Sequence, residues 1–298
     1  MRFVRSIVCV SSLALGSVAY AQDPQTPPPE ATPAPAPAPT KDTGAAAGAA
    51  GSYMGPEINR PLTMPQGGIE GELAIPIQRI SVATPIGTVS STGESMALAG
   101  RYGIMPNLNA GAMLAFELNP DANFSNFLVN GEYEFMPGSM MMAAGRVDIG
   151  VTHTGGMTSS NAFDLGLGVP FKYVLTPMFA FISGSQYNIV PFGGIGGTDI
   201  LFFGFGDSTT IGLNIPVGIL AQVHPMFDVQ VRTGFSLVHQ SAGGVSTDSK
   251  FVPLNFDLIG NLNMGGVGID PYFTLGIAGS TDDYTALMTF LIGARVHL

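Results

Sequence analysis

Four histidines are spread along the chain, and one of them has a neighbour at a spacing that could do chemistry. His239 and Ser241 are two residues apart, so in an extended chain their side chains share one face. A hydroxyl beside an imidazole is the core of nucleophilic acyl transfer, but a third group must orient the imidazole. The sequence identifies no acid for that role. We therefore expect the protein not to be an enzyme.

Metal, cofactor and nucleic-acid sites are not indicated either. Cys9 is the only cysteine, no metal-ligand spacing stands out, and no glycine-rich phosphate loop is present. The 21 acidic residues outnumber the 11 basic ones, which gives a formal charge of −10. Nucleic-acid binding needs basic patches. We expect no metal, no cofactor and no nucleic-acid partner.

Charged residues of both signs lie opposite apolar ones in the second half of the sequence and around residue 130. If the chain is extended there, they share the polar face of its strands. The positions expected on this face are Arg101, Glu117, Glu132, Glu134, Arg146, Asp148, Asp164, Lys172, Asp228, Arg232, Asp257 and Arg295. Such a set either shapes a field that sorts solutes in a polar channel or pairs internally in a filled interior.

A strict alternation supplies the elements that would position these charges. From Thr210 to Val223 the odd positions are aliphatic, while the even ones are mostly small or polar. Charged residues make up 11% of the chain, against about 25% in soluble domains. Apolar-out, polar-in segments of about 10 residues are typical of transmembrane barrel strands. The pattern predicts an all-β fold, a transmembrane antiparallel up-and-down β-barrel.

Short and long connections alternate along the chain, as in outer-membrane barrels with short periplasmic turns and longer external loops. Short turns fall near residues 106, 137, 177, 225 and 265, and longer segments at 81–93, 119–125, 153–160, 190–208, 240–249 and 279–283. This predicts about 12 strands and places both chain ends in the periplasm. The expected strands are 69–80, 94–104, 108–118, 126–136, 139–152, 161–175, 178–189, 209–223, 226–239, 250–263, 270–278 and 284–298.

The N-terminal part divides into a signal and a spacer. Arg2 and Arg5 precede an apolar run that ends in Ala19-Tyr20-Ala21, which predicts a signal peptide at residues 1–21. Residues 22–68 form a spacer rich in Pro, Ala and Gly, disordered at least in its first part. From residue 51 the spacer is loop-like and either enters or underlies the barrel. Residues 69–298 are the expected barrel domain.

The last residues carry a further signature. Gly293 is followed by apolar residues at Val296 and Leu298. Together with the signal peptide and the strand pattern, this resembles the C-terminal assembly signal of Gram-negative outer-membrane β-barrel proteins. The resemblance is to the architecture in general, and it departs from the usual motif at Leu291 and in the final Leu. It implies an outer-membrane location, with lipid, lipopolysaccharide and the barrel-assembly machinery as partners. The spacing of His239 and Ser241 also resembles that of outer-membrane lipid hydrolases, but two residues alone match.

One long connection, Val190–Asp207, is unusually apolar. It contains the aromatic and aliphatic residues Phe192, Ile195, Phe202, Phe203 and Phe205. Such a segment is suited to fold into the lumen as a gate, to rest on the outer leaflet, or to extend the wall as a strand.

Taken together, the sequence favours a porin-like passive channel for small solutes. The alternative is a structural or surface-display barrel without conduction, and an outer-membrane hydrolase is a weaker alternative. The Pro/Ala-rich spacer gives the cell wall as an additional partner.

Overall fold

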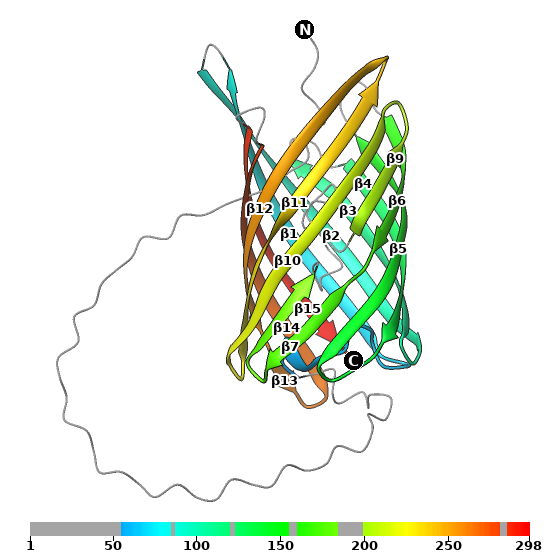
Figure 1. Ribbon diagram of the computed structural model, residues 1–298, viewed down its shortest axis with the longest axis vertical. Helices are drawn as coiled ribbons and strands as arrows, with labels where there is room; N and C mark the ends of the chain where they lie inside the picture. The colour runs from blue at the N-terminus through cyan, green and yellow to red at the C-terminus, as the bar shows by residue number, and fades with distance from the viewer. Residues whose placement is uncertain (1–54, 85–86, 120–122, 155–159, 184–198, 281–284) are drawn as a thin grey trace, which may run out of the picture.

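The computed structural model describes residues 55–84, 87–119, 123–154, 160–183, 199–280 and 285–298. The expected signal peptide and most of the expected spacer therefore lie outside the described residues. The described chain forms one closed antiparallel barrel (Figure 1). None of its helices is long and apolar enough to cross a membrane.

Fifteen strand segments make up the wall, and a single short 3-10 helix, η2 (Glu57–Asn59), precedes them in the described chain. The segments are β1 (Ile69–Thr84), β2 (Gly87–Met105), β3 (Leu108–Asn119), β4 (Asn123–Met136), β5 (Met141–Thr154), β6 (Ser160–Gly168), β7 (Phe171–Thr176), β8 (Phe179–Ser183), β9 (Asp199–Phe205), β10 (Thr209–His224), β11 (Phe227–Ala242), β12 (Val245–Gly260), β13 (Leu262–Met264), β14 (Val267–Ser280) and β15 (Thr285–His297).

Three wall strands are each made of two segments. Strand β5 pairs with both β6 and β7, β10 pairs with both β8 and β9, and β14 pairs with both β12 and β13. The fifteen segments thus occupy 12 positions in the wall. The barrel closes where β1 pairs with β15, from Glu70 opposite His297 to Val82 opposite Thr285. The prediction of an all-β, 12-stranded antiparallel barrel is confirmed.

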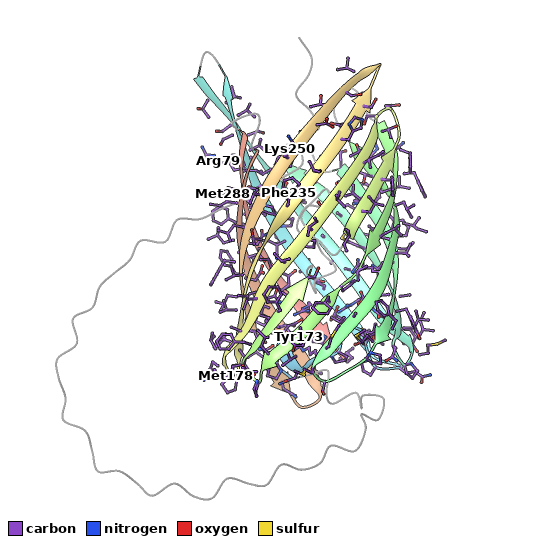
Figure 2. All side chains as sticks on the ribbon, in the orientation of Figure 1. Arg79, Tyr173, Met178, Phe235, Lys250 and Met288 are labelled. Carbon is purple, nitrogen blue, oxygen red and sulfur yellow. The ribbon has the colours of Figure 1, made fainter. Side chains whose placement is uncertain are left out.

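Alternation of side chains follows the pleat of each strand. In β10, Leu213 and Ile215 point outward and are 38% and 53% exposed, while Asn214 points inward and is 2% exposed. The outward side chains are largely hydrocarbon around the barrel, as Phe235 and Met178 illustrate (Figure 2). The outward charges Arg79 and Lys250 lie near the end of the barrel opposite the C-terminus (Figure 2). The alternation predicted from the sequence is thus present in the wall.

The two ends of the barrel differ. The C-terminus and the short turns lie at one end, called here the C-terminal rim; the β1–β2 and β11–β12 hairpins project at the opposite rim (Figure 1). The segments 81–93 and 240–249 were expected to be loops, and this is wrong for most of their length. Residues 87–94 are exposed on both faces yet remain paired with β1. Water rather than lipid surrounds a projecting ribbon, so its ladder continues without an apolar face.

A second correction concerns the apolar connection at 190–208. Residues 199–205 form β9, which pairs with β6 and β10, so Phe202, Phe203 and Phe205 belong to the wall and not to a gating loop. Phe203 and Phe205 lie on one face with stacked rings, and Phe205 is 48% exposed on the outward side. Phe203 and Phe205 are thus on the outward face, whereas Phe202 packs against an apolar cluster of the interior. Phe192 and Ile195 lie outside the described residues.

The last part of the spacer takes one of the two places expected for it. This part, residues 55–68, lies inside the barrel at the C-terminal rim, where Ile58, Leu62 and Met64 are buried. We call residues 55–68 the plug. Its residues show no strand or helix periodicity, yet the inner wall covers most of it.

Candidate functional site: the barrel interior and its plug

The structure places the expected polar-face residues on the inner side of the wall. Ten of the twelve are buried there, and the other two, Glu117 and Asp164, are half-buried. The buried ten are Arg101, Glu132, Glu134, Arg146, Asp148, Lys172, Asp228, Arg232, Asp257 and Arg295. That these residues select solutes stays a prediction, but their inward orientation follows the alternation.

Three of the five inner cations are fixed by carboxylates of the wall itself. Each guanidinium makes two parallel hydrogen bonds of 2.7–3.0 Å to one carboxylate, a geometry that is strong and directional. The pairs are Arg101 with Glu70, Arg146 with Asp148, and Arg232 with Asp257. These side chains lie along the wall as matched pairs.

The plug is held first by apolar contacts. Ile58 packs in a buried cluster with Ala180, Ile182 and Leu220 of the inner wall. Further along the plug, Leu62 packs with inner-wall residues of β5. These contacts bury the plug without adding it to the strand ladder.

The end of η2 is fixed by a lysine of the wall. Nζ of Lys172 donates hydrogen bonds to the carbonyl oxygens of Glu57 and Arg60, at 2.7 and 2.8 Å. The carbonyl oxygen of Glu57 also accepts from the N–H of Arg60 at 3.3 Å, so the lysine supplies a second, charged donor there. Beyond the helix, Thr63 donates from its hydroxyl and its backbone N–H to Oε2 of Glu134, at 2.8 and 3.3 Å.

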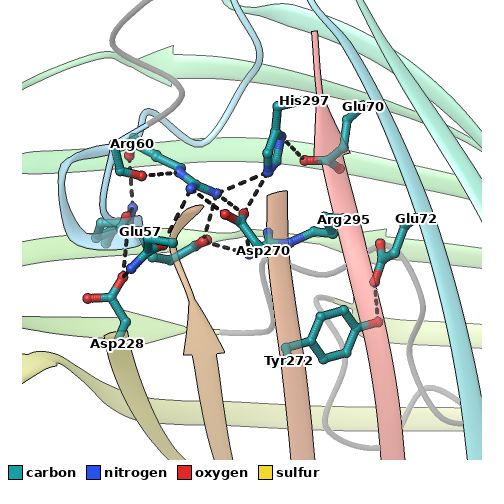
Figure 3. A network of polar contacts seen from close by, with 12 residues as sticks. Glu57, Arg60, Glu70, Glu72, Asp228, Asp270, Tyr272, Arg295 and His297 are labelled. Atoms are coloured by element: carbon teal, nitrogen blue, oxygen red, sulfur yellow. Dashed lines mark hydrogen bonds and ion pairs between the residues drawn. The ribbon is translucent and has the colours of Figure 1, made fainter. Parts of the chain in front are cut away.

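Arg60 lies at the centre of a buried network (Figure 3). Both terminal nitrogens of its guanidinium donate to the carboxylate of Asp270, and Nη2 lies 2.8 Å from Oδ1. Nη2 also donates to Oδ1 of Asn261 at 3.4 Å, and Nε donates to the carbonyl of Gly55 at 2.7 Å. Nε2 of His297 lies 2.6 Å from Oδ2 of Asp270, on the same side. Arg60 thus contacts both strands of the β14–β15 pair, and Asn261 between β12 and β13.

Glu57 makes the second set of polar contacts between plug and wall. Its carboxylate accepts from Nη2 of Arg295 at 2.7 Å and from Nη1 of Arg60 at 3.3 Å. Its backbone N–H donates to Oδ2 of Asp228 at 2.7 Å. Burial alone would raise the pKa of Glu57, but the charges of Arg295 and Arg60 outweigh it and hold this pKa below its usual value.

The same network keeps Arg60 charged. Burial would lower the pKa of its guanidinium, but the hydrogen bond to Asp270 and the charge of Glu57 raise that pKa above its usual value. Breaking one side of a buried charge pair is strongly destabilising, because the remaining charge stays buried. The plug is therefore held by a few contacts that depend on one another.

Sequence reasoning missed several residues of this site. Glu70, Glu72, Asp270 and His297 all follow the alternation of their strands, so extending the same parity to the first and last strands finds them. Glu57 and Arg60 carry no such signal, because the plug has no period. His297, within the expected strand 284–298, is buried beside Asp270 and Glu70.

Residues of the expected assembly signal lie in β15 and just after it. Val296 and Leu298 point outward, 38% and 58% exposed. At Gly293, a Cβ atom would lie 2.4 Å from the ring of Tyr272. The missing side chain lets Tyr272 cross β15 and donate to Oε1 of Glu72 on β1 at 2.6 Å (Figure 3). The role of Gly293, Val296 and Leu298 in barrel assembly stays a prediction.

An apolar layer lies further along the interior, toward the opposite rim. Val238, Phe251, Ala278 and Leu287 form a buried cluster, and Phe202 packs against it across Gly212. A second inner cluster includes Leu291, where the usual assembly motif has a polar residue. The interior therefore alternates between charged and apolar layers.

His239 and Ser241 lie on β11 toward the opposite rim. Nδ1 of His239 is 2.7 Å from Oδ1 of Asp248 on β12, an acid that the sequence did not identify. The side chains of His239 and Asp248 are exposed, by 46% and 72%. Among the described residues no hydrogen bond joins His239 to Ser241. Within the same residues, no group of three or more His, Cys, Asp or Glu is arranged to hold a metal ion.

Comparison with protein-family models and with curated proteins finds no match, but solved structures resemble the chain. An outer membrane channel from Pseudomonas putida F1 has a TM-score of 0.52 at 11% identity, with 79% of this chain and 96% of that chain covered. The translocator domain of the autotransporter NalP from Neisseria meningitidis has a TM-score of 0.48 at 10% identity, covering 78% and 90%. The KdgM porin has a TM-score of 0.42 at 9% identity, covering 74% and 97%. The chain has the fold of bacterial outer-membrane β-barrels.

Proposed function

We propose that the protein is an outer-membrane channel for small solutes, closed at rest by residues 55–68. The observation that carries the proposal is that a segment outside the wall fills the C-terminal end of the interior. Ile58, Arg60 and Met64 of this segment are each at most 2% exposed. A barrel filled by its own wall residues has nothing to remove, whereas a plug can leave without breaking a strand ladder.

Energetics support a removable plug. The contacts described above between residues 57–64 and the strands each involve a side chain, whereas Gly67 and Gly68 are joined to Gly103 of β2 by backbone hydrogen bonds. Unpaired backbone facing lipid costs several kcal/mol per group, and releasing residues 57–64 creates none, because the wall strands stay paired with each other and Gly67 and Gly68 keep their bonds to Gly103. The polar inner face left behind is suited to water and ions.

The proposed orientation puts the C-terminal rim in the periplasm. Short turns at that rim and projecting hairpins at the other are typical of outer-membrane barrels. With a cleaved signal peptide, the spacer before the plug then lies in the periplasm, within reach of the cell wall. Lipopolysaccharide would surround the opposite rim, and the barrel-assembly machinery would insert the chain.

Topology can be tested by labelling short tags on intact cells. A tag at Asp248, in the β11–β12 hairpin, is expected to be labelled, and a tag at Thr40 is not. Both tagged proteins should be labelled after the outer membrane is permeabilised, which controls for expression. Labelling at Thr40 on intact cells contradicts the proposed orientation.

Conduction is tested in planar bilayers with the mature protein and a variant that lacks residues 57–64. The plugged protein is expected to be closed for most of the time, and the variant is expected to show stable steps of higher conductance. Heat-modifiable gel mobility and resistance to protease confirm that the variant is folded. A folded variant that conducts no more than background contradicts the channel.

The alternative is a structural or surface-display barrel. The buried apolar layer around Phe251 and Leu287 favours it, because apolar side chains that touch across an interior exclude water. Two hairpins that project beyond the rim also suit display. Silence of the folded plug deletion in the bilayer experiment supports this alternative.

A further inference from the structure

The wall builds a site of its own around the guanidinium of Arg60. Asp270 comes from β14, His297 from β15, and Asn261 from the short gap between β12 and β13. Asp270 and His297 are at most 1% exposed, and Asn261 is 9% exposed. Asp270 receives the two arms of the guanidinium fork, and Asn261 accepts a further N–H from one arm (Figure 3). These are wall residues, so the site remains when the plug leaves.

Two more wall groups complete the set. Arg295 donates to the carboxylate of Glu57 at 2.7 Å, and Asp228 accepts the backbone N–H of Glu57 at 2.7 Å. Asp228 is fully buried, and among the described residues its Oδ1 has no hydrogen-bond partner. The wall therefore presents a receptor for a guanidinium, a receptor for a carboxylate and an acceptor with spare capacity for an N–H donor.

We propose that this part of the wall is a binding site for arginine and related guanidinium-bearing solutes, and that Arg60 and Glu57 occupy it as an internal ligand. The guanidinium of free arginine competes with that of Arg60 for Asp270 and Asn261. The carboxylate position adjoins the guanidinium position, since Nη2 of Arg295 lies 3.4 Å from Oδ2 of Asp270, so the guanidinium is the group that the site selects. Binding itself does not depend on conduction; that binding opens a pore rests on the proposed function.

The geometry discriminates between cations. A guanidinium is planar and presents paired N–H groups that match the two oxygens of a carboxylate, whereas an ammonium is a point charge without this fork. Lysine is therefore expected to compete poorly at Asp270 and Asn261. Because Arg60 is tethered, its effective concentration is on the order of millimolar. Free arginine must reach about that range, which suits a solute that passes through rather than one that is retained.

Competition can be measured with a thiol reporter in the plug. The only native cysteine, Cys9, lies in the expected signal peptide, so Met64→Cys supplies the sole thiol of the mature chain. Met64 is 2% exposed, so a maleimide labels the variant only when the plug leaves. L-arginine at about 10–50 mM, above the expected effective concentration, should speed labelling several-fold. Agmatine, which carries the guanidinium without the carboxylate, should also speed labelling, and lysine or sodium chloride at equal ionic strength should act least.

Chemical rescue of an Arg60 variant tests the same site through the opposite effect, a slowing of labelling. In Met64→Cys with Arg60→Ala the plug is expected to label faster, and guanidinium ion should slow labelling by reseating it, recovering at least half of the change. Methylammonium at equal concentration should not. Equal effects of arginine and lysine, or no rescue in a folded Arg60→Ala variant, overturn the proposal. If that variant does not fold, the arginine–lysine comparison in Met64→Cys alone decides. Competition by arginine in a protein that never conducts supports the binding site and rejects the channel.

Discussion

Glu57 lies between two guanidinium groups, and its charge can be removed by acid. Its pKa in the folded protein is below the usual 4.5. The stabilisation that this carboxylate gives is therefore fully present above that value and is lost as the pH falls through the lower, folded pKa. Arg295, Arg60 and Lys172 favour its charged form, and Asp270 opposes it.

We therefore expect the plug to loosen in acid before the wall unfolds. Hydrogen exchange of residues 57–64, corrected for its intrinsic pH dependence, should rise as the pH falls below about 4.5, with strand amides as the internal reference. Glu57→Gln should show faster exchange already at neutral pH and a flatter pH profile. Plug protection that stays constant to pH 3, while the strands also stay protected, contradicts this prediction.

Gly293 matters because Tyr272 occupies the space of a side chain. A Cβ atom at Gly293 would lie 2.4 Å from the tyrosine ring and 2.8 Å from the carbonyl oxygen of Leu73. Gly293→Ala should lower the free energy of unfolding by about 1–3 kcal/mol, the usual cost of overpacking. The measurement is urea unfolding in lipid vesicles.

The matched control for this variant is Gly279→Ala on β14, where a Cβ atom would meet nothing within 4 Å. It should change stability little. Gly293→Ala combined with Tyr272→Ala should recover part of the loss, because the ring no longer opposes the methyl group. A Gly293→Ala variant as stable as the control rules out this close approach.

At the scale of the element, β10 tests which face meets lipid. Leu213 points outward, and the adjacent Asn214 points inward, where it accepts a hydrogen bond from Ser236 at 2.6 Å. Leu213→Lys should destabilise the folded barrel by about 2–4 kcal/mol, the cost of a lysine facing the middle of the bilayer. Asn214→Lys should cost less, since its charge faces the interior. Equal losses for the two variants in lipid unfolding would show that the register is wrong.

Strands with one lipid face could be predicted from the sequence, because lipid imposes an apolar residue at every second position. This is why β10 and β11 match the expected ranges closely. The projecting hairpins were missed because both faces of a strand such as residues 87–94 are exposed, so its residues do not alternate between apolar and polar. Strand β9 was one of three alternatives for residues 190–207, because the alternation of Phe203 and Phe205 is too short to decide between them. Charged residues on the inner face were found by parity, whereas their partners in the plug were not.

At the scale of the whole molecule, composition was sufficient to indicate a membrane barrel. With 11% charged residues, the chain has too few of them to cover the surface of a soluble domain. Composition could not indicate what fills the barrel. The plug is a short irregular segment, and its place depends on Asp228, Asp270 and Arg295, which are more than 160 residues away along the chain. Contacts of that range leave no periodic signal in a single sequence.

Those long-range contacts bear on how the barrel closes. Its last step must pair β1 with β15, whose opposed residues, such as Glu70 and His297, are far apart in the sequence, and closing such a contact is slow. The plug ends where β1 begins, at Ile69, and Arg60 binds Asp270 on the strand beside β15. We therefore predict that plug docking brings the first strand to the last one before their ladder forms.

Arg60→Ala should therefore slow folding into lipid vesicles more than it speeds unfolding, as expected for a contact already made in the transition state. Stopped-flow mixing and heat-modifiable mobility over time would report the two rates. A variant that folds at the normal rate but unfolds faster would place plug docking after closure. If the expected rates are found, the segment proposed to close the channel also guides the two ends of the chain together during assembly.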